Sequence, residues 1–397
     1  MLRMRRAPEP RKAGFGVDYK DPYLTLVRLL VDAATLEHTL LASHLYALFS
    51  IKDGYVGVRG ELTPDVFRLQ PPDARRPSMP HSFLDVAIEE LQHLAILNQL
   101  LYELHAAPCL ERHAFPHRFE TYPFELELRS LDRYTAATFT WLEAAAAEFD
   151  PELGDERLVE DLKHVITNGS KLNAAYAWKR VTGVERLGSL YARILELLAA
   201  LQDDAPAFIP QSFEWGVWAD RVDRVRNRGE IEHFHFFRSL FTGDAFGADE
   251  TIWEDPRSQE YPAVVLAWKP ALESGRRNNG TGVGHELARL SNLIYGSLLC
   301  LLELSCRSDD RRSIQVAIEQ LASALWWLGL ELAQEHHLGI PLEVMRVRYD
   351  LGRDDRVGWL IITRLIDEAR SCAERIGRAA LPARFDLGVF ERTLDLR

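Results

Sequence analysis

The apolar residues of this chain recur at three- and four-residue steps over long stretches, and this spacing constrains the fold more than any other feature. It places the apolar side chains along one face of an α-helix. The pattern predicts helices over residues 21–51, 81–105, 130–149, 157–180, 184–202, 219–241, 283–306, 311–338 and 356–379. No alternating strand pattern of useful length and no repeat of short period accompanies them. The sequence therefore predicts an all-α protein with four long helices before residue 250.

Turn and breaker residues divide the chain into three parts. The basic, proline-bearing start lacks the apolar core of a signal peptide, so residues 1–19 are expected to form a disordered tail. Residues 20–250 are expected to form the helical core, in which Ser82 is a candidate N-cap and Gly243 ends a helix. Residues 251–397 are interpreted as a linker followed by C-terminal helices that pack on this core.

The composition narrows the class of protein. The chain has 397 residues, of which 47% are hydrophobic, and a net charge of −12. This is ordinary globular composition, and the negative charge argues against a nucleic-acid partner. No apolar run reaches the roughly 20 residues of a membrane span, so no membrane partner is expected. The four cysteines include no Cys-x-x-Cys pair, which excludes a thiolate zinc knuckle and favours buried, reduced thiols in a cytoplasmic protein. A homo-oligomer is left open.

Three of the predicted helices place carboxylates in their apolar rows, and two of them add a histidine three residues later. The residues are Glu37 in the first helix, Glu90 and His93 in the second, and Glu230 and His233 in the helix that ends at Gly243. A Glu and a His at this spacing lie side by side on a helix. A further pair, Glu232 and His235, falls on a polar row and is assigned to the surface or to the surroundings of the site.

Buried charges of this kind cost several kcal/mol each unless they are paired or bound to a metal. Carboxylate and imidazole groups suit iron, manganese or zinc, and four-helix bundles that hold two metal ions use Glu together with Glu-x-x-His. The sequence therefore favours a metal centre between the helices. The alternative from the same residues is a set of buried Glu–His ion pairs that bind no metal.

At these residues the chain resembles the ferritin-like domain family of the iminophenylpyruvate dimer synthase type, which occurs in violacein-type biosynthesis. The resemblance covers roughly residues 20–305 and is carried by LEHTLLASHLYALFSI (36–51), EELQHLAILNQLL (89–101), RLGSLYARILELL (186–198), GEIEHFHFFRSLF (229–241) and LSNLIYGSLLCLLEL (290–304). It implies a ferritin-like four-helix bundle with additional C-terminal helices. It also implies that the five Glu and His residues above ligate two metal ions, with oxidative chemistry on amino-acid-derived metabolites.

Two positions depart from the family pattern. Ser189 stands where the third helix of the family commonly carries Glu, before a pair ending in Tyr191, and Glu185 is the nearest replacement ligand. His44 stands where the family tends to have Tyr. Ser189, Tyr191 and His44 are therefore expected around the metals or in the substrate pocket, although a core histidine that bonds a carbonyl also fits His44. Losing the third-helix carboxylate leaves open whether two ions bind or one.

These observations lead to one prediction and two alternatives. The prediction is a non-haem iron oxidoreductase with two irons, or one, that uses O₂ on a small-molecule substrate; manganese or zinc would also suit the ligands. An apolar row of Leu41, Leu97 and Phe237 is expected to keep water from the reaction. The first alternative is a synthase that couples imines without needing a metal. The second is a metal-free helical scaffold protein, which the serine at position 189 would favour.

Overall fold

The fold was analysed in a computed structural model. The structure describes residues 19–63, 82–118, 122–144, 155–170, 187–266, 282–308, 311–343, 351 and 355–395. The predicted tail at residues 1–19 lies almost entirely outside these ranges, as do parts of the predicted loops. Helices dominate the described residues, so the all-α prediction is confirmed.

The first two rods of the bundle are α1 (Pro22–Ser50) and α3 (Phe83–Glu103), which run antiparallel and pack along their lengths. The Ser82 side chain accepts a hydrogen bond from the Asp85 amide, and Asp85 accepts one from the Ser82 amide. This capping box confirms Ser82 as the N-cap. At the other end, the Tyr23 hydroxyl donates to the Leu104 carbonyl at 2.9 Å. This second bond links the start of α1 to the end of α3 and fixes how the two helices are aligned there.

The fourth rod consists of α8 (Trp215–Asn227), a π-helical turn η3 (Arg228–His233) and α9 (Phe234–Thr242). The sequence predicted one uninterrupted α-helix over residues 219–241. The structure contradicts this, because the π turn η3 separates α8 from α9. Gly243 ends the rod in the left-handed region, with φ 90°. A Cβ at this position would lie 2.3 Å from the Asp249 carbonyl oxygen, so glycine is required for this turn.

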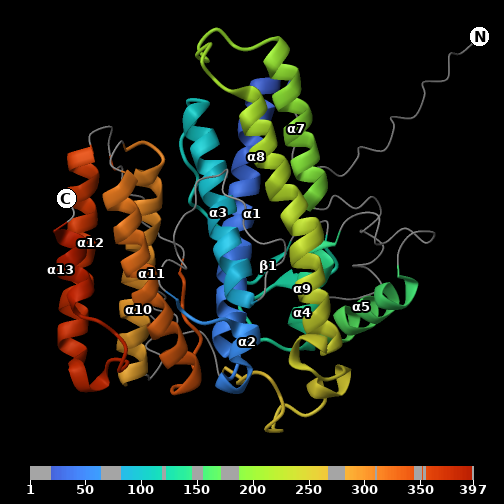
Figure 1. Ribbon diagram of the computed structural model, residues 1–397, viewed down its shortest axis with the longest axis vertical. Coiled ribbons are helices and arrows are strands. Elements are labelled where there is room, and N and C mark those ends of the chain that lie inside the picture. Colours follow the sequence, from blue (N-terminus) through green and yellow to red (C-terminus); the bar gives the residue numbers. More distant parts are fainter. Residues whose placement is uncertain are drawn as a thin grey trace, which may run out of the picture.

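The third rod is divided into two shorter helices, α4 (Arg133–Glu143) and α7 (Leu187–Asp203). Helix α4 packs against α9, and α7 packs against α8 and α1. The Arg133 side chain reaches Glu250, beyond the lower end of α9, so α4 starts at the bottom of the bundle in Figure 1 and ends near its middle. Helix α7 begins at that level and continues upward (Figure 1). The interruption therefore falls halfway along the bundle.

Smaller elements connect these rods. They are η1 (Asp53–Tyr55), α2 (Val56–Arg59), α5 (Glu156–Gly169), η4 (Asp244–Phe246), η5 (Glu250–Trp253) and a two-stranded antiparallel sheet of β1 (His117–Arg118) and β2 (Glu125–Leu126). The sheet lies largely within a stretch without a strand pattern in the sequence, because each strand is too short to show alternation.

Three predicted helices are shorter than expected. Helix α4 ends at Glu143 and α5 at Gly169, because the next residues, Ala144 and Ser170, have extended backbone. Helix α11 (Arg311–Gln334) ends before residue 338. The remaining parts of the first two predictions lie outside the described residues.

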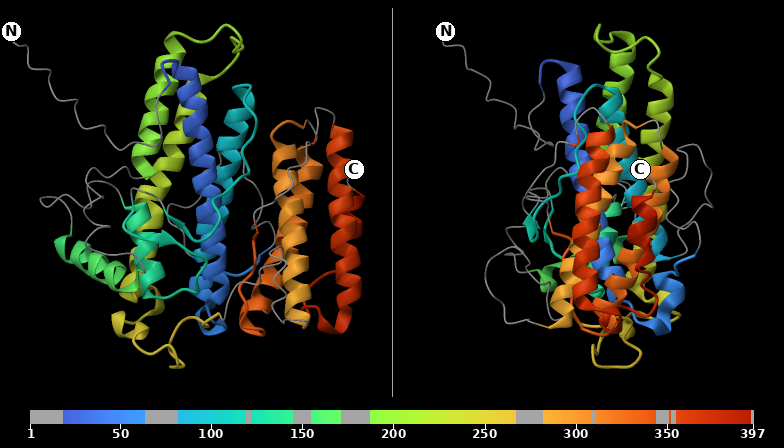
Figure 2. Two further views of the ribbon diagram at one scale, coloured as in Figure 1. Left: turned by 180° about the vertical axis from the view of Figure 1, so that it is seen from behind. Right: turned by 90° about the vertical axis from the view of Figure 1, so that its left-hand side faces the viewer.

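The C-terminal helices form a second layer beside α1 and α3, on the side away from α7 and α8 (Figures 1 and 2). They are α10 (Val283–Ser305), α11 (Arg311–Gln334), α12 (Asp355–Ile376), the turn η6 (Arg378–Ala380) and α13 (Gly388–Leu394). The Gln334 side chain donates to the carbonyls of Phe49 and Ile51 at 2.7 and 3.1 Å, and Tyr295 hydrogen-bonds His38. These bonds join the layer to α1.

Helix α10 is long and apolar enough to span a membrane by length and composition, with a mean hydropathy of 1.4 in its most apolar window. Of that window, 72% is buried inside the protein, as expected for a core helix. All four cysteines are free and buried, as the sequence predicted.

Candidate metal centre

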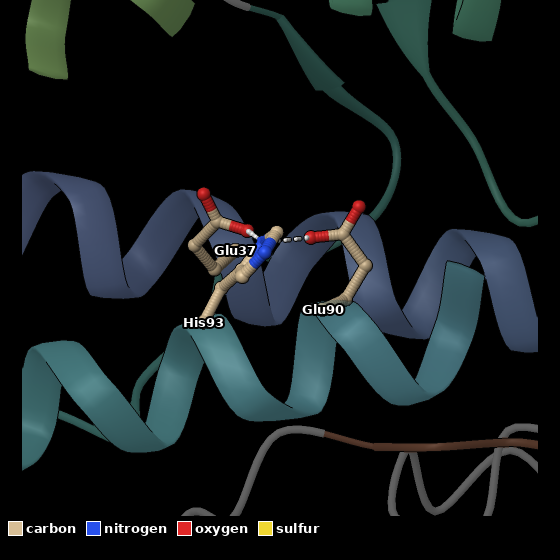
Figure 3. A group of neighbouring side chains, drawn as sticks. All are labelled: Glu37, Glu90 and His93. Carbon is tan, nitrogen blue, oxygen red and sulfur yellow. Dashed lines mark ion pairs between the residues drawn. The ribbon is translucent and has the colours of Figure 1, made fainter. Parts of the chain in front are cut away.

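The middle of the bundle brings together three of the predicted ligands. Glu37 on α1 and Glu90 and His93 on α3 point toward one another and are almost fully buried (Figure 3). The His93 Nδ1 atom lies 3.4 Å from Glu37 Oε2 and 3.3 Å from Glu90 Oε2. Donor atoms of these three residues lie within 4.8 Å of one another, so they could hold a metal ion.

His233, the last residue of the π turn η3, approaches the same carboxylate from the fourth rod. Its Nδ1 atom lies 3.3 Å from Glu90 Oε1, and its ring stacks on His93 with 5.7 Å between centroids. Glu90 therefore lies between two histidines and directs one oxygen to each. A carboxylate in this position can bridge two ions, each with its own histidine.

Glu143 and His44 form a second group around Glu90. Donor atoms of His44, Glu90 and Glu143 lie within 4.8 Å of one another, and all three side chains are buried. Glu143, the last residue of α4, was not among the ligands predicted from the sequence. Its signal was available, because Ala136, Phe139 and Glu143 follow one another at helical spacing on the buried face of α4.

His44 lies in an aromatic surround rather than against a carbonyl. Its ring centroid is 4.5 Å from that of Phe139 and 4.9 Å from that of Phe237. Within the described residues, neither of its ring nitrogens makes a hydrogen bond, and Nδ1 lies 3.5 Å from Glu90 Oε1. The interpretation of His44 as a core histidine that bonds a carbonyl is therefore wrong.

Tyr191 lies beside the centre and Ser189 does not. The Tyr191 hydroxyl donates a hydrogen bond to Glu37 Oε1, and its ring is buried. Ser189 is exposed, because the side of α7 that packs inward carries Leu187, Leu190 and Tyr191. Position 189, where the family's third helix commonly carries a glutamate, is thus at the surface. Helix α4 instead supplies a carboxylate, that of Glu143, to the centre.

Two predicted ligands lie outside the side chains that the structure describes. Glu185 lies outside the described residues, and the side chain of Glu230 is not among those that the structure describes, although its backbone lies in η3. The pair Glu232 and His235 lies toward the surface, as expected: Glu232 is partly buried and His235 is exposed.

A small cavity opens onto the centre. It has a volume of about 260 Å³, including the part open to solvent. Its lining consists of Glu37, Glu90, His93, Glu143, Leu187, Gly188, Tyr191, Val225, Arg226 and His233. The candidate ligands therefore share one space with the first turn of α7 and with an arginine of α8.

Burial and mutual contact shift the carboxyl groups of the centre in opposite directions. Burial, with the nearby Glu90, raises the pKa of Glu37 to about 7 and that of Glu143 to about 8. Burial also opposes ionisation of Glu90, but its close polar contacts with Glu37, His233 and His93 keep its pKa well below the usual range. Without a metal, Glu90 is therefore the ionised carboxylate, and Glu143 is protonated at pH 7.

The pKa values of the histidines are also shifted in opposite directions. Burial alone would lower the pKa of His93, but the close contacts of its ring with Glu37 and Glu90 raise it to about 9. Burial also works against protonation of His233, and its contacts with Glu89 and Glu90 raise its pKa well above the usual range. Burial lowers the pKa of His44 to about 4, so His44 is neutral and can donate an electron pair to a metal.

Several buried polar atoms of the centre make no hydrogen bond, which fits the binding of a cation. Among the described residues, the buried atoms without a hydrogen-bond partner include Glu37 Oε2, Glu90 Oε1, His93 Nε2, His233 Nδ1, and both polar atoms of Glu143 and of His44. Each unpaired buried group costs about 1–3 kcal/mol, and such a concentration needs an explanation. Nitrogen and oxygen ligands bind Zn²⁺ at about 2.0–2.2 Å, so donors on opposite sides of such an ion lie about 4.0–4.4 Å apart. The donor atoms of each group lie within 4.8 Å of one another, so each group could surround one ion.

Comparison with known proteins agrees with this arrangement. A family model described as Ferritin-like matches residues 30–241. The chain belongs to the ferritin-like family. The ferritin-like match includes Glu37, Glu90, Glu143 and His233, and it ends within α9, so the C-terminal helices lie outside it. No curated protein and no solved structure gave a match.

Proposed function

We propose that this ferritin-like protein is a non-haem iron oxidoreductase that uses O₂ to oxidise a small, amino-acid-derived metabolite. The observation that carries the proposal is the position of Glu90, with one carboxylate oxygen 3.3 Å from His93 Nδ1 and the other 3.3 Å from His233 Nδ1. A buried carboxylate between two imidazoles supports a centre of two ions that share this residue.

The ligands divide into two sets around Glu90. Glu37 and His93 would hold one ion. Glu143 and His233, with His44 in reach, would hold the other, so Glu143 compensates for the absence of a carboxylate at Ser189. When bound, ferrous ions would supply the capacity to bind O₂ and to take part in electron transfer.

The side chains around the centre exclude water and hold a proton. Leu41, Leu97 and Phe237 are at most 5% exposed, which supports the predicted role of this apolar row. Tyr191 keeps its hydroxyl proton directed at Glu37. A dry surround strengthens the electrostatic interactions of the ligands and protects a reactive substrate from hydrolysis.

Arg226 supports a substrate that carries a carboxylate. It lines the same cavity as the candidate ligands and pairs with the partly exposed Asp223 at 2.7 Å. A guanidinium group binds a carboxylate through two parallel hydrogen bonds, and an amino-acid-derived metabolite provides that group. We expect 2-oxo acids to raise the melting temperature more than their amides, and R226Q to abolish this difference.

The resemblance to the iminophenylpyruvate dimer synthase type supports a place in natural-product biosynthesis. Such a substrate would contain an amino-acid carbon skeleton and an oxidisable C–N or C–C unit.

Metal analysis of protein purified and loaded under anaerobic conditions tests the proposal. We expect about two irons per chain in the wild type, and loss of stoichiometric iron in H93A and in H233A. E103Q, on the same helix as His93 but bonded to Trp218 (2.9 Å), is the matched control and should retain both ions. Wild-type protein that binds no iron, or variants with unchanged iron content, would contradict the proposal.

A metal-free function is supported by one specific observation. The protonated forms of His93 and His233 lie beside the carboxylates of Glu90 and Glu89, so the cluster is paired in charge without an ion. An imine-coupling synthase or a helical scaffold could use such a cluster for stability alone. Activity that survives a chelator would favour the synthase, and absence of metal together with absence of activity would favour the scaffold.

A further inference from the structure

We infer that Glu89 is a positioning residue that, together with Arg228, fixes the imidazole of His233 with Nδ1 directed at the centre. The inference rests on the proposed function where it concerns metal binding. It assigns a role to a carboxylate that the helical pattern of α3 does not place among the ligands.

The contacts of Glu89 lie on the outer side of His233. Its Oε2 atom is 2.9 Å from His233 Nε2, and its Oε1 atom is 3.4 Å from the Arg228 Nη1 atom. Glu89 is only 3% exposed and His233 is fully buried, whereas the Arg228 side chain is 23% exposed. A chain of contacts therefore runs from a partly exposed guanidinium, through a buried carboxylate, to a candidate ligand.

The π turn η3 explains why two residues of one helix reach the same carboxylate. Arg228 and His233 are its first and last residues, five positions apart. In a regular α-helix, residues five apart point about 140° away from each other. The wider π turn, with its i→i+5 hydrogen bonds, brings such residues closer to one face. Both side chains can then contact Glu89 on the neighbouring rod.

The consequence concerns which nitrogen of His233 can bind a metal. Because Nε2 donates its hydrogen to Glu89, Nδ1 is the atom left for the centre, and it lies 3.3 Å from Glu90 Oε1. Carboxylate partners of this kind fix the orientation of a metal-binding histidine and raise its basicity. Both oxygens of Glu89 are engaged by His233 and Arg228, so Glu89 acts through the histidine.

The test compares the change of Glu89 to Leu with the same change at Glu103. Glu103 is also on α3 and bonds across to Trp218 of α8, so E103L removes a comparable link outside the centre. We expect anaerobic Co²⁺ titrations of the full-length chain to show binding about 10–100-fold weaker in E89L, with an altered visible Co²⁺ spectrum. E89Q and R228Q should give smaller losses, and E103L should stay within about twofold of the wild type.

Wild-type affinity and an unchanged spectrum in E89L would overturn the inference, and so would equal losses in E89L and E103L. If E89L fails to fold, E89Q and R228Q carry the same comparison against E103Q. Absence of Co²⁺ binding by the wild type would instead defeat the proposed function. In that case crystal structures of the metal-free protein decide: we expect the His233 ring to turn in E89L, and an unturned ring would overturn the positioning role.

Discussion

At the scale of single residues, Glu143 is a buried group whose properties suit the binding of a metal ion rather than the stabilisation of the fold. Both of its oxygens lack a hydrogen bond within the described residues, and burial raises its pKa to about 8. At pH 7 the metal-free protein therefore contains the neutral acid, which an amide resembles in size and charge. Binding a cation requires the ionised form, which the amide cannot provide.

We therefore predict that E143Q loses one of the two ions while the metal-free protein keeps its stability. The melting temperature without metal should change little, because a neutral group replaces a neutral group. Metal analysis and thermal unfolding of the same preparations check the two halves of the prediction. Retention of two ions by E143Q would remove Glu143 from the ligand set.

His113 provides a pH dependence away from the centre. Burial and the neighbouring His117, whose ring stacks on it with 3.7 Å between centroids, lower the pKa of His113 to about 4. In the unfolded chain a histidine titrates near about 6.5, so between these pH values the unfolded state binds more protons. The free energy of unfolding should consequently fall as pH decreases from about 6.5 to about 4.

The variant H113N should show a shallower loss of stability over this pH range, because asparagine does not titrate. Urea unfolding at a series of pH values measures the slope. H235N, at an exposed histidine of α9, is the control and should follow the wild type. A slope in H113N equal to that of the wild type would contradict the prediction.

The sequence predicted those site residues that lie on the same helix face as apolar residues. Glu37, Glu90, His93 and His233 share rows with apolar residues, and the structure buries all four. Glu89 could not be found in this way, because it adjoins Glu90 and its role depends on Arg228 from another rod. His44 lies in an apolar row too, but its surround of aromatic rings comes from helices far apart in sequence.

At the scale of elements, the hydrophobic periodicity did not predict two features: the π turn within the fourth rod and the division of the third rod into α4 and α7. A π turn widens a helix locally, and no pattern of proline or glycine in the sequence predicts it here. The division of the third rod into α4 and α7 depends on contacts with α9, α8 and α1, which are remote in sequence. Propensity and spacing are local quantities, so they predict that helices exist but not how tertiary packing interrupts them.

Close packing between α11 and α1 gives a prediction for Gly329. A Cβ at this position would lie 2.5 Å from ring atoms of Phe49, which is buried and packs against Trp326. G329A should therefore destabilise the protein by about 1–3 kcal/mol, because the ring has to move within a filled core. Chemical denaturation measures this change.

The matched control is G216A in α8, where an added Cβ meets nothing within 4 Å. Alanine favours a helix over glycine by about 0.5–1 kcal/mol, so this variant should be neutral or more stable. Equal behaviour of the two variants would mean that the C-terminal layer tolerates a shift against α1.

At the scale of the whole molecule, periodicity predicted the class of fold, and the family match confirms a ferritin-like domain over residues 30–241. The position of the C-terminal helices beside α1 and α3 was expected only in general terms. It depends on particular bonds, such as those from Gln334 to the end of α1, that connect residues almost 300 positions apart in sequence. A single sequence does not reveal pairings at this separation.

Metal binding should stabilise the whole ferritin-like domain. An ion at 100 times its dissociation constant contributes about 2.7 kcal/mol per site. With an unfolding entropy of about 2.1 cal/mol/K per residue, this corresponds to a rise in melting temperature of about 3 °C per site for a chain of this length. Scanning calorimetry with Mn²⁺ or Co²⁺ measures the shift.

The same shift should be absent in H93A and present in E103Q. An equal rise in H93A would place the stabilising ion elsewhere in the molecule, and a wild type that shows no rise would contradict metal binding to the folded state.

The break in the third rod has a consequence for which molecules can reach the ligands. Helix α4 stops at Glu143, and the first turn of α7, with Leu187 and Gly188, borders the cavity. Position 188 therefore contributes only backbone to the lining of the cavity. A larger residue at this position would change the wall of the cavity, and with it which compounds bind beside the ligands, without replacing a candidate ligand.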